Sequence, residues 1–179
     1  MKTAWIIACG TELTRGSSVD TNSPWLAREL GRLGIGIKAF CTVPDVLDTL
    51  VTALQYAARQ ADVIVLTGGL GPTQDDLTRA ALAQAAGVEL ETDARSLEFL
   101  RNYFAQRRRE MPEINRVQAL LPRGARALPN TCGTAPGVAL SLGNCQVYAM
   151  PGVPYEMEAM FSGAVAPELR SVAAGRVLL

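Results

Sequence analysis

A short apolar run followed directly by a glycine-rich turn is the feature that most constrains the fold of this 179-residue chain. The run at residues 62–66 reads DVIVL, and the turn at residues 67–76 reads TGGLGPTQDD and leads into a helical pattern. A buried strand, a glycine turn and a helix start in this order are typical of phosphate-binding loops in α/β proteins. The sequence therefore predicts an anion site at this turn.

The turn combines amides that attract an anion with carboxylates that repel one. Gly68, Gly69 and Gly71 leave backbone amides open, while Asp75 and Asp76 bring negative charge to the same rim. The two features agree if a divalent cation bridges them, or if the acids face a ribose hydroxyl or an attacking water. The alternative is a tight connection in which one aspartate only caps the helix. No lysine follows the glycines, so a P-loop is not predicted.

Strand-like and helix-like segments alternate along the chain, which predicts one sheet with helices on both faces. Strands are expected at residues 4–8, 36–43, 62–66, 137–141 and 146–149, and helices at about 24–33, 45–59, 77–86, 93–108 and from 154 to about 170. Asn22 or Ser23 is expected to cap the first helix and Asp45 the second. Residues 112–122 are predicted to be mostly turn. With no linker or repeat, a single domain is expected.

Composition excludes several classes of function. Lys and Arg total 17 and Asp and Glu total 17, so no global field attracts nucleic acid or a membrane surface. No histidine is present, which excludes Ser-His-Asp hydrolysis and imidazole metal sites and leaves oxygen ligands for Mg²⁺ or Mn²⁺. The cysteines show no paired C-x-x-C spacing, the first residues do not form a secretory segment, and no run reaches the roughly 20 apolar residues of a spanning helix. We therefore expect a cytoplasmic chain with reduced thiols.

Three polar loops are expected to share the carboxyl edge of the sheet, where open α/β sheets bind ligands. They lie at residues 10–22, 67–76 and 151–154. The first loop carries two carboxylates, an amide and several hydroxyls, although a solvated loop has the same composition. The third is explained equally well by strand termination and a proline at a helix start.

Six short motifs, taken in order, resemble the N-terminal domain of the CinA family. They are GTEL at 10–13, DTN at 20–22, TGGLGPT at 67–73, DDLT at 75–78, GTAPG at 133–137 and PGVP at 151–154. The resemblance spans about residues 4–170. It places the chain with the molybdenum-cofactor-biosynthesis superfamily, whose members are similar to MogA and MoaB.

The resemblance implies a three-layer α/β/α sandwich with a mostly parallel sheet that binds a nucleotide or a pterin at the glycine turn. It also implies a dimer or trimer, and a hydrolase that needs a divalent metal (Mg, Mn or Co) to split ADP-ribose into AMP and a sugar phosphate. A single domain is expected over residues 1–179, with no KH-like segment and no C-terminal deamidase domain.

The preferred hypothesis gives each predicted site residue a role. The amides of Gly68, Gly69 and Gly71 hold phosphate, and Thr73 and Thr78 orient its oxygens. Asp75 and Asp76 bind the metal and, with Glu12 and Asp20, form the catalytic set. Further substrate contacts are expected at Gly10, Thr11, Asn22, Thr67, Leu70, Pro72, Pro151 and Gly152.

Two other functions fit the same site. One is molybdopterin binding or adenylylation, because the phosphate of a pterin would use the same amides. The other is a non-catalytic nucleotide-binding module. Val117 supports the second alternative, since it stands where many CinA-like chains carry a lysine, and a lost cation weakens phosphate binding.

Overall fold

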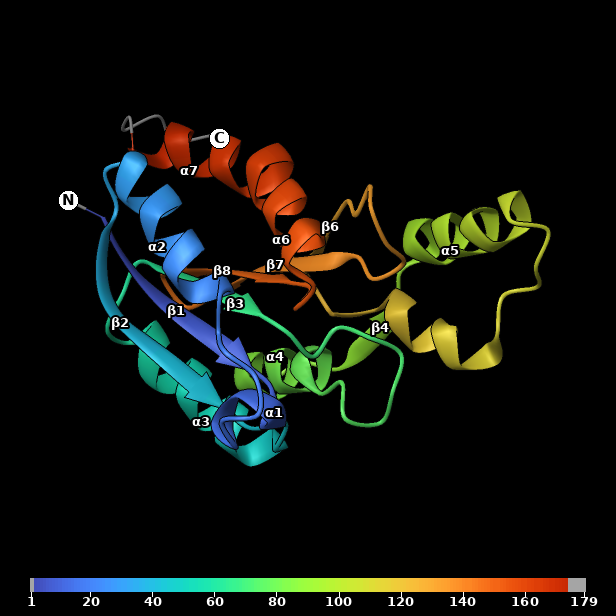
Figure 1. The fold of residues 1–179 in the computed structure, drawn as a ribbon, viewed down its shortest axis with the longest axis horizontal. Coiled ribbons are helices and arrows are strands. Elements are labelled where there is room, and N and C mark those ends of the chain that lie inside the picture. The colour runs from blue at the N-terminus through green and yellow to red at the C-terminus, as the bar shows by residue number, and fades with distance from the viewer. Residues whose placement is uncertain (1, 174–179) are drawn as a thin grey trace.

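The centre of the computed structural model, which describes residues 2–173, is a six-stranded sheet with the strand order β2-β1-β3-β8-β7-β6 (Figure 1). Four strands run parallel, and β7 and then β6 are added as antiparallel neighbours. The strands are β1 (Thr3–Cys9), β2 (Gly36–Val43), β3 (Val63–Thr67), β8 (Cys145–Met150), β7 (Gly137–Leu142) and β6 (Arg126–Leu128). The predicted mostly parallel sheet is confirmed. The ends of the predicted domain, residues 1 and 174–179, lie outside the described residues.

Helices cover both faces of the sheet, so the predicted three layers are confirmed (Figure 1). One face packs on α3 (Leu47–Ala58) and α4 (Thr78–Ala86). The other packs on α2 (Asn22–Arg32), α6 (Pro154–Met160) and α7 (Ala166–Ala173), the last two joined by the π-helical turn η2 (Phe161–Val165).

Strand β3 lies between the two cores, and all five of its residues are buried. Ile64 and Leu66 pack toward α3 and α4, whereas Val63 and Val65 pack toward the opposite helices. A strand buried on both faces needs apolar residues at every position, which is the reason for the uninterrupted apolar run. This burial fixes where the glycine turn begins.

A unit of residues 90–122 lies beside the sheet (Figure 1). It pairs β4 (Leu90–Thr92) with β5 (Leu120–Pro122) and contains α5 (Ala94–Gln106) and the 3-10 helix η1 (Glu113–Ala119). The prediction that residues 112–122 are mostly turn is wrong. Strands β4 and β6 and the short helix α1 (Thr11–Thr14) were not predicted either. Such short segments show too few alternations for a period to be recognised.

Both predicted helix caps are wrong, and both errors concern the functional edge. Asn22 and Ser23 lie inside α2, whose cap position is Thr21, and the amide of Ser23 donates to Asp20, one residue before that cap, at 3.0 Å. Helix α3 begins after Val46 without a side-chain cap, because Asp45 is bonded elsewhere. The start of α5, in contrast, has a side-chain cap for which no prediction was made, since Asp93 accepts from the amide of Ser96 at 2.7 Å.

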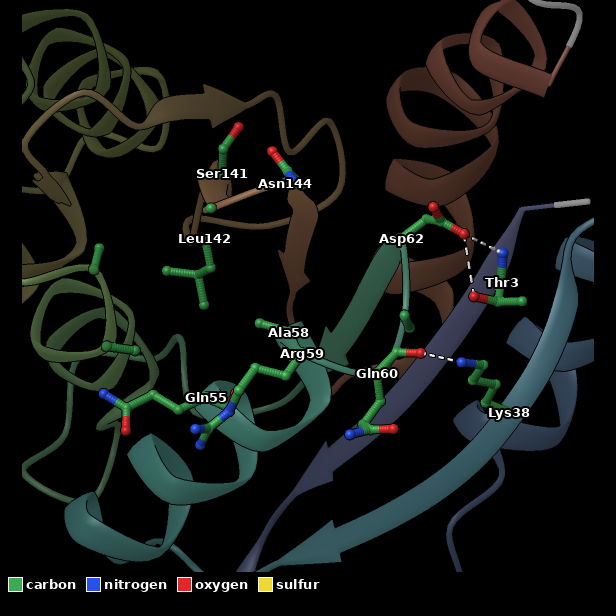
Figure 2. A pocket seen from close by; sticks show the side chains of 14 residues that line it. Thr3, Lys38, Gln55, Ala58, Arg59, Gln60, Asp62, Ser141, Leu142 and Asn144 are labelled. Carbon is green, nitrogen blue, oxygen red and sulfur yellow. Dashed lines mark hydrogen bonds between the residues drawn. The ribbon is translucent and has the colours of Figure 1, made fainter.

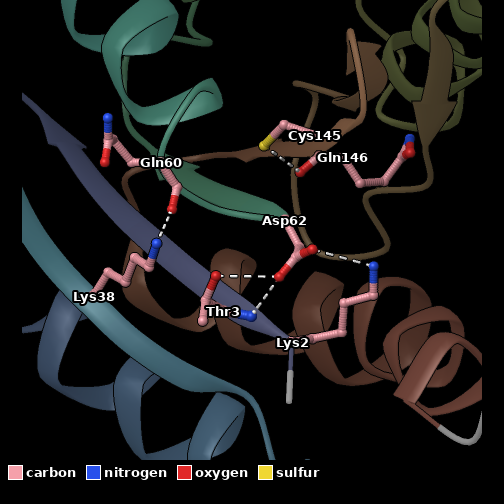
Figure 3. A network of polar contacts seen from close by, with 7 residues as sticks. All are labelled: Lys2, Thr3, Lys38, Gln60, Asp62, Cys145 and Gln146. Carbon is pink, nitrogen blue, oxygen red and sulfur yellow. Dashed lines mark hydrogen bonds and ion pairs between the residues drawn. The ribbon is translucent and has the colours of Figure 1, made fainter.

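The amino edge of the parallel strands carries a hollow of about 960 Å³ between the end of α3 and the β7–β8 turn (Figure 2). Figure 3 shows the hydrogen bonds and the ion pair that the charged groups near this hollow form. Asp62 accepts from the amide of Thr3 at 2.8 Å and pairs with Lys2 at 3.3 Å, and Lys38 donates to the carbonyl of Gln60. The amide of Thr3 is the main reason that the pKa of Asp62 lies below its usual value. These charged groups are thus bonded within the fold. The larger hollow lies at the edge of the sheet opposite the predicted site.

Edge strand β2 is protected from pairing with another chain along part of its length. The register with β1 shifts between Ala4 and Trp5, which leaves Lys38 as an extra residue in β2. A bulge and a lysine are common protective features of edge strands.

Within residues 2–173, no helix has the length and apolar character needed to cross a bilayer. The cytoplasmic location stays a prediction.

Replacement of Leu66 by alanine should lower the free energy of unfolding by about 3 kcal/mol, because it leaves a cavity in a fully buried central strand. The matched control is Val19→Ala at a side chain that is 84% exposed, for which we expect a change within about 0.5 kcal/mol. Urea denaturation measures both. Equal effects would contradict the placement of β3 at the centre.

Candidate functional site

A cavity of about 430 Å³ opens at the carboxyl ends of the parallel strands, where the sequence predicts the ligand. Its wall is formed by the end of β1, the glycine turn after β3, the turn after β8, the loop before β7 and helix η1. The glycine turn contributes the continuous stretch from Gly68 to Pro72. The cavity therefore joins segments that are far apart in the sequence.

The three predicted loops are tied together by one buried asparagine. The Nδ2 atom of Asn22 donates to Thr67 Oγ1 at 2.9 Å and to the carbonyl of Gly152 at 2.8 Å. Thr67 Oγ1 in turn donates to the carbonyl of Pro151 at 2.9 Å. The prediction that these loops share one edge is confirmed. Asn22 Oδ1 is enclosed and has no partner among residues 2–173.

Two turn positions require glycine because the chain approaches itself closely. Gly68 has a φ of 105°, and a Cβ atom there would lie 2.1 Å from the carbonyl oxygen of Cys9. Gly69 has a φ of 66°, and its Cβ would lie 2.5 Å from Thr78 Oγ1. Thr78 uses that hydroxyl to donate to the carbonyl of Gly68 at 2.8 Å. Its hydroxyl thus holds the turn, whereas the sequence predicted that it orients ligand oxygens.

Two of the three amides predicted to hold phosphate are already bonded within the protein. Gly68 N donates to the carbonyl of Met150 at 3.0 Å, and Gly71 N donates to Asp76 Oδ1 at 2.7 Å. The phosphate role of these two amides stays a prediction, and in this structure both are used by the fold. The amides of Gly69 and Leu70 have no hydrogen-bond partner in the described part of the chain. The amides of Gln74 and Asp75 are also without a partner there, but Gly69 and Leu70 belong to the continuous stretch of the turn that lines the cavity.

Asp75 and Asp76 are not equivalent, although the sequence assigned them the same role. Asp76 Oδ2 accepts from the amide of Thr73 at 2.8 Å and from its hydroxyl at 2.6 Å, so Asp76 and Thr73 shape the turn. Asp75 also lines the cavity but makes no hydrogen bond within residues 2–173. Its carboxylate is therefore the free one.

A buried arginine supports the turn from behind. Arg79 is 4% exposed, and its two terminal nitrogens donate to the carbonyls of Leu70 at 2.8 Å and Gly71 at 2.5 Å. Burial lowers the pKa of Arg79 to about 10, and the carboxylate of Asp76 opposes that shift. The guanidinium stays charged at neutral pH, and Arg79 is not among the residues that line the cavity.

Asp45 is a site residue that the sequence analysis misassigned as a cap. Its Oδ2 accepts from the amide of Thr11 at 2.7 Å, and its own amide donates to Thr11 Oγ1 at 3.1 Å. This reciprocal pair fixes Gly10 and Glu12, the neighbours of Thr11, at the cavity wall. Its position directly after a parallel strand could have identified Asp45, because such strands end at the same edge.

Cys9 lines the cavity but is unsuited to act as a nucleophile. Burial, and then the adjacent Asp45 carboxylate, raise the pKa of its thiol well above the usual value. The thiol donates to Asp45 Oδ1 at 3.3 Å. Since the thiolate is the reactive form, this cysteine is inert at neutral pH.

Asn130 organises the loop before β7, whose purpose the sequence left open. Its Oδ1 accepts from the amides of Cys132 at 3.0 Å and Gly133 at 2.9 Å. Its Nδ2 donates to the carbonyl of Ala135 at 2.9 Å and to Glu156 Oε2 at 2.7 Å. One buried amide thereby fixes both the loop and a carboxylate at the cavity.

The side chains around the cavity are strongly acidic. Five carboxylates line it and no lysine or arginine does: Glu12, Asp45, Asp75, Asp76 and Glu156. Among residues 2–173, no group of three or more Cys, Asp or Glu side chains is arranged so that it could hold a metal ion without further ligands. Mg²⁺ is commonly held by one or two carboxylates together with substrate phosphates and water. The oxygen donors present therefore fit a hard divalent cation that binds with its ligand.

The fold and this edge define an α/β domain with a ligand cavity at the carboxyl ends of its parallel strands. The family model for a probable molybdopterin binding domain matches residues 5–171. A solved structure of the protein CinA, with unknown function, from Thermoplasma acidophilum is 32% identical, covers 94% of this chain and 98% of that one, and has a TM-score of 0.88. The chain belongs to the molybdopterin-binding domain family, in its CinA-like branch.

Other relatives extend beyond the matched region. A CinA-like protein from Frankia casuarinae is 45% identical over 93% of this chain, which spans 40% of that protein. A protein from Pyrobaculum calidifontis is 44% identical over 96% of the chain, which spans 65% of it. The molybdopterin biosynthesis enzyme MoaB from Thermus thermophilus has 21% identity over 98% of both chains and a TM-score of 0.64, which supports the shared fold.

Asp76→Ala should lower the free energy of unfolding by about 1 to 2 kcal/mol, because three hydrogen bonds to a charged group are lost. Asp75→Ala is the matched control, and we expect a change within about 0.5 kcal/mol. Chemical denaturation distinguishes them. Equal destabilisation by the two variants would contradict the division of roles.

Iodoacetamide at pH 8 should modify the exposed Cys132 and leave Cys9 unmodified in the folded chain. The raised pKa of Cys9 keeps its thiol protonated, and that state persists as pH rises past the value for a free cysteine. Peptide mass spectrometry after digestion measures the modified fraction. Labelling of Cys9 at the rate of Cys132 would contradict its burial; addition of urea should make the two rates equal.

Proposed function

We propose that this domain hydrolyses the phosphoric anhydride of a nucleotide diphosphate sugar, such as ADP-ribose, to AMP and a sugar phosphate. The observation that supports this proposal is the pairing of free amides at Gly69 and Leu70 with a wall of five carboxylates. A diphosphate in such a wall is repelled unless a cation enters with it. The site thus favours a phosphate ligand that arrives with a divalent metal.

Asp75 and Glu12 are the residues that we expect to hold Mg²⁺, Mn²⁺ or Co²⁺. Both line the cavity and also a second hollow beside it, together with Asp45. Asp45 and Asp76 already accept hydrogen bonds from the backbone, whereas Asp75 accepts none within residues 2–173. A bound divalent cation would neutralise phosphate charge and lower the pKa of an attacking water.

The protein's own groups supply binding and orientation. The amide of Gly69 donates toward the phosphate, and the Arg79 cation behind the turn adds a favourable field without occupying the cavity. Asp20 belongs to a neighbouring hollow of about 200 Å³ that shares Cys9, Glu12 and Gly152 with the main cavity. Asp20 would therefore serve the sugar or base and not the metal.

Molybdopterin binding or adenylylation is the second function that an observation favours. The family that contains this chain is described as a probable molybdopterin binding domain. A pterin phosphate would use the same two amides.

The third alternative, a non-catalytic module, loses part of its support, because Val117 is not among the cavity-lining residues of the described chain. The predicted dimer or trimer also stays a proposal, which light scattering can measure.

Purified protein should release AMP from ADP-ribose only with Mg²⁺, Mn²⁺ or Co²⁺, and Asp75→Asn should lower kcat at least about 100-fold. Glu12→Gln should lower it by about 10-fold or more, whereas Glu110→Gln, at an exposed glutamate outside the cavity, should leave it unchanged. Chromatography of AMP measures turnover.

Absence of turnover with every metal would rule out the hydrolase. Tight binding of a molybdopterin-type pterin without cleavage would favour the second function. Nucleotide binding that does not depend on metal and gives no product would favour the non-catalytic module.

A further inference from the structure

Gln118 is the one residue that the unit of residues 90–122 contributes to the cavity wall. It lies in helix η1 and is 1% exposed, so the protein keeps a neutral amide almost fully buried beside the ligand cavity. Amides are rarely buried without hydrogen-bond partners, because each unmade bond is costly. The partners of Gln118 therefore show what it does.

One half of the Gln118 amide is bonded within its own helix. Asn115 Nδ2 donates to Gln118 Oε1 at 2.9 Å, which turns Gln118 Nε2 to the other side. Nε2 makes no hydrogen bond among residues 2–173. Among residues 2–173, Asn22 Oδ1 is the single enclosed side-chain nitrogen or oxygen without a partner, so Gln118 Nε2 keeps some exposure. Gln118 lines the cavity, and the cavity is therefore where we expect Nε2 to find a partner.

Electrostatics supports this orientation of the two amides. Reversing both would preserve their mutual hydrogen bond but would point Gln118 Oε1 at the cavity. A carbonyl dipole facing five carboxylates is repelled, whereas an amide NH₂ facing them is attracted. The acidic wall thus favours a donor at this position.

On the basis of the proposed function, we propose that Gln118 contacts the ligand directly and donates its Nε2 hydrogens to a phosphate oxygen. Asn115 is the positioning residue, because it acts only through the Gln118 carbonyl. The turn amides of Gly69 and Leu70 and the amide of Gln118 would then hold the phosphate from two elements of the cavity wall. The unit of residues 90–122 acquires a role in ligand recognition through this contact.

The experiment measures the binding of ADP-ribose and of ADP, with Mn²⁺, by isothermal titration calorimetry. Gln118→Met keeps the size of the side chain and removes the donor, and we expect a Kd about 10-fold higher for both probes. Gln118→Glu should weaken binding further, because it adds a sixth carboxylate. Gln84→Met, at an exposed glutamine of α4, is the matched control and should bind as the unmodified chain does.

Asn115→Asp tests the positioning role without altering any atom that would touch the ligand. The new carboxylate accepts hydrogen bonds only, so it should bind Gln118 Nε2 and turn Oε1 toward the cavity. We expect the same loss as in Gln118→Met, and no additional loss when the two changes are combined. The ¹⁵N resonance of the Gln118 side chain should also shift when ADP is added to the unmodified chain.

The outcomes separate this inference from the proposed hydrolysis. Binding that depends on Gln118 without any turnover supports the contact and overturns the hydrolase. Turnover with unchanged Kd in Gln118→Met, Gln118→Glu and Asn115→Asp overturns the contact alone. If the unmodified chain binds neither probe, the phosphate assignment of Gln118 is overturned. Should Gln118→Met unfold, Asn115→Asp and the NMR shift decide.

Discussion

The hydrogen bonds of the Asn22 side chain hold together the edge on which the site is built. Four parallel strands end at that edge, and the backbone ladders of β1, β3 and β8 stop where their loops begin. Asn22 donates to Thr67 and Gly152, and Gly68 N continues the pairing of β3 with β8 by donating to Met150. These bonds bring the glycine turn so close to β1 that no side chain fits at Gly68. The loops that these bonds connect supply much of the cavity wall.

The same bonds determine which polar groups remain for a ligand. A polar group that is bonded within the fold is not available for binding, so the scaffold and the site divide one set of atoms between them. Asp76, Thr73 and Thr78 belong to the scaffold, whereas Asp75 and the amide of Gly69 have no partner within residues 2–173. Neighbouring residues with the same chemistry, such as Asp75 and Asp76, thereby acquire different functions.

The sequence could locate the loops but not this division of atoms. The apolar run before Thr67 and the glycine spacing place the turn, and strand order brings the other loops beside it. Whether Gly68 N donates to Met150 depends on long-range register, which one sequence does not reveal. Asp45 was missed because a helix cap and a loop clamp have the same local pattern. Gln118 was missed because helix η1 is too short to give a period, although it follows Val117, a position already singled out.

The charges on the two sides of the glycine turn explain why phosphate and metal are expected together. Behind the turn, Arg79 binds the carbonyls of Leu70 and Gly71 and favours an anion in front. In front, five carboxylates disfavour the same anion. One buried guanidinium does not cancel five negative groups, so the wall disfavours an anion alone, and a cation alone would need further oxygen ligands. In the proposed function each would become favourable in the presence of the other, because a metal would screen the carboxylates and a phosphate would supply it with further oxygen ligands. Under the proposed function, such a site would bind metal and phosphate cooperatively, and the neutral donor of Gln118 would add affinity for the phosphate without competing for the metal.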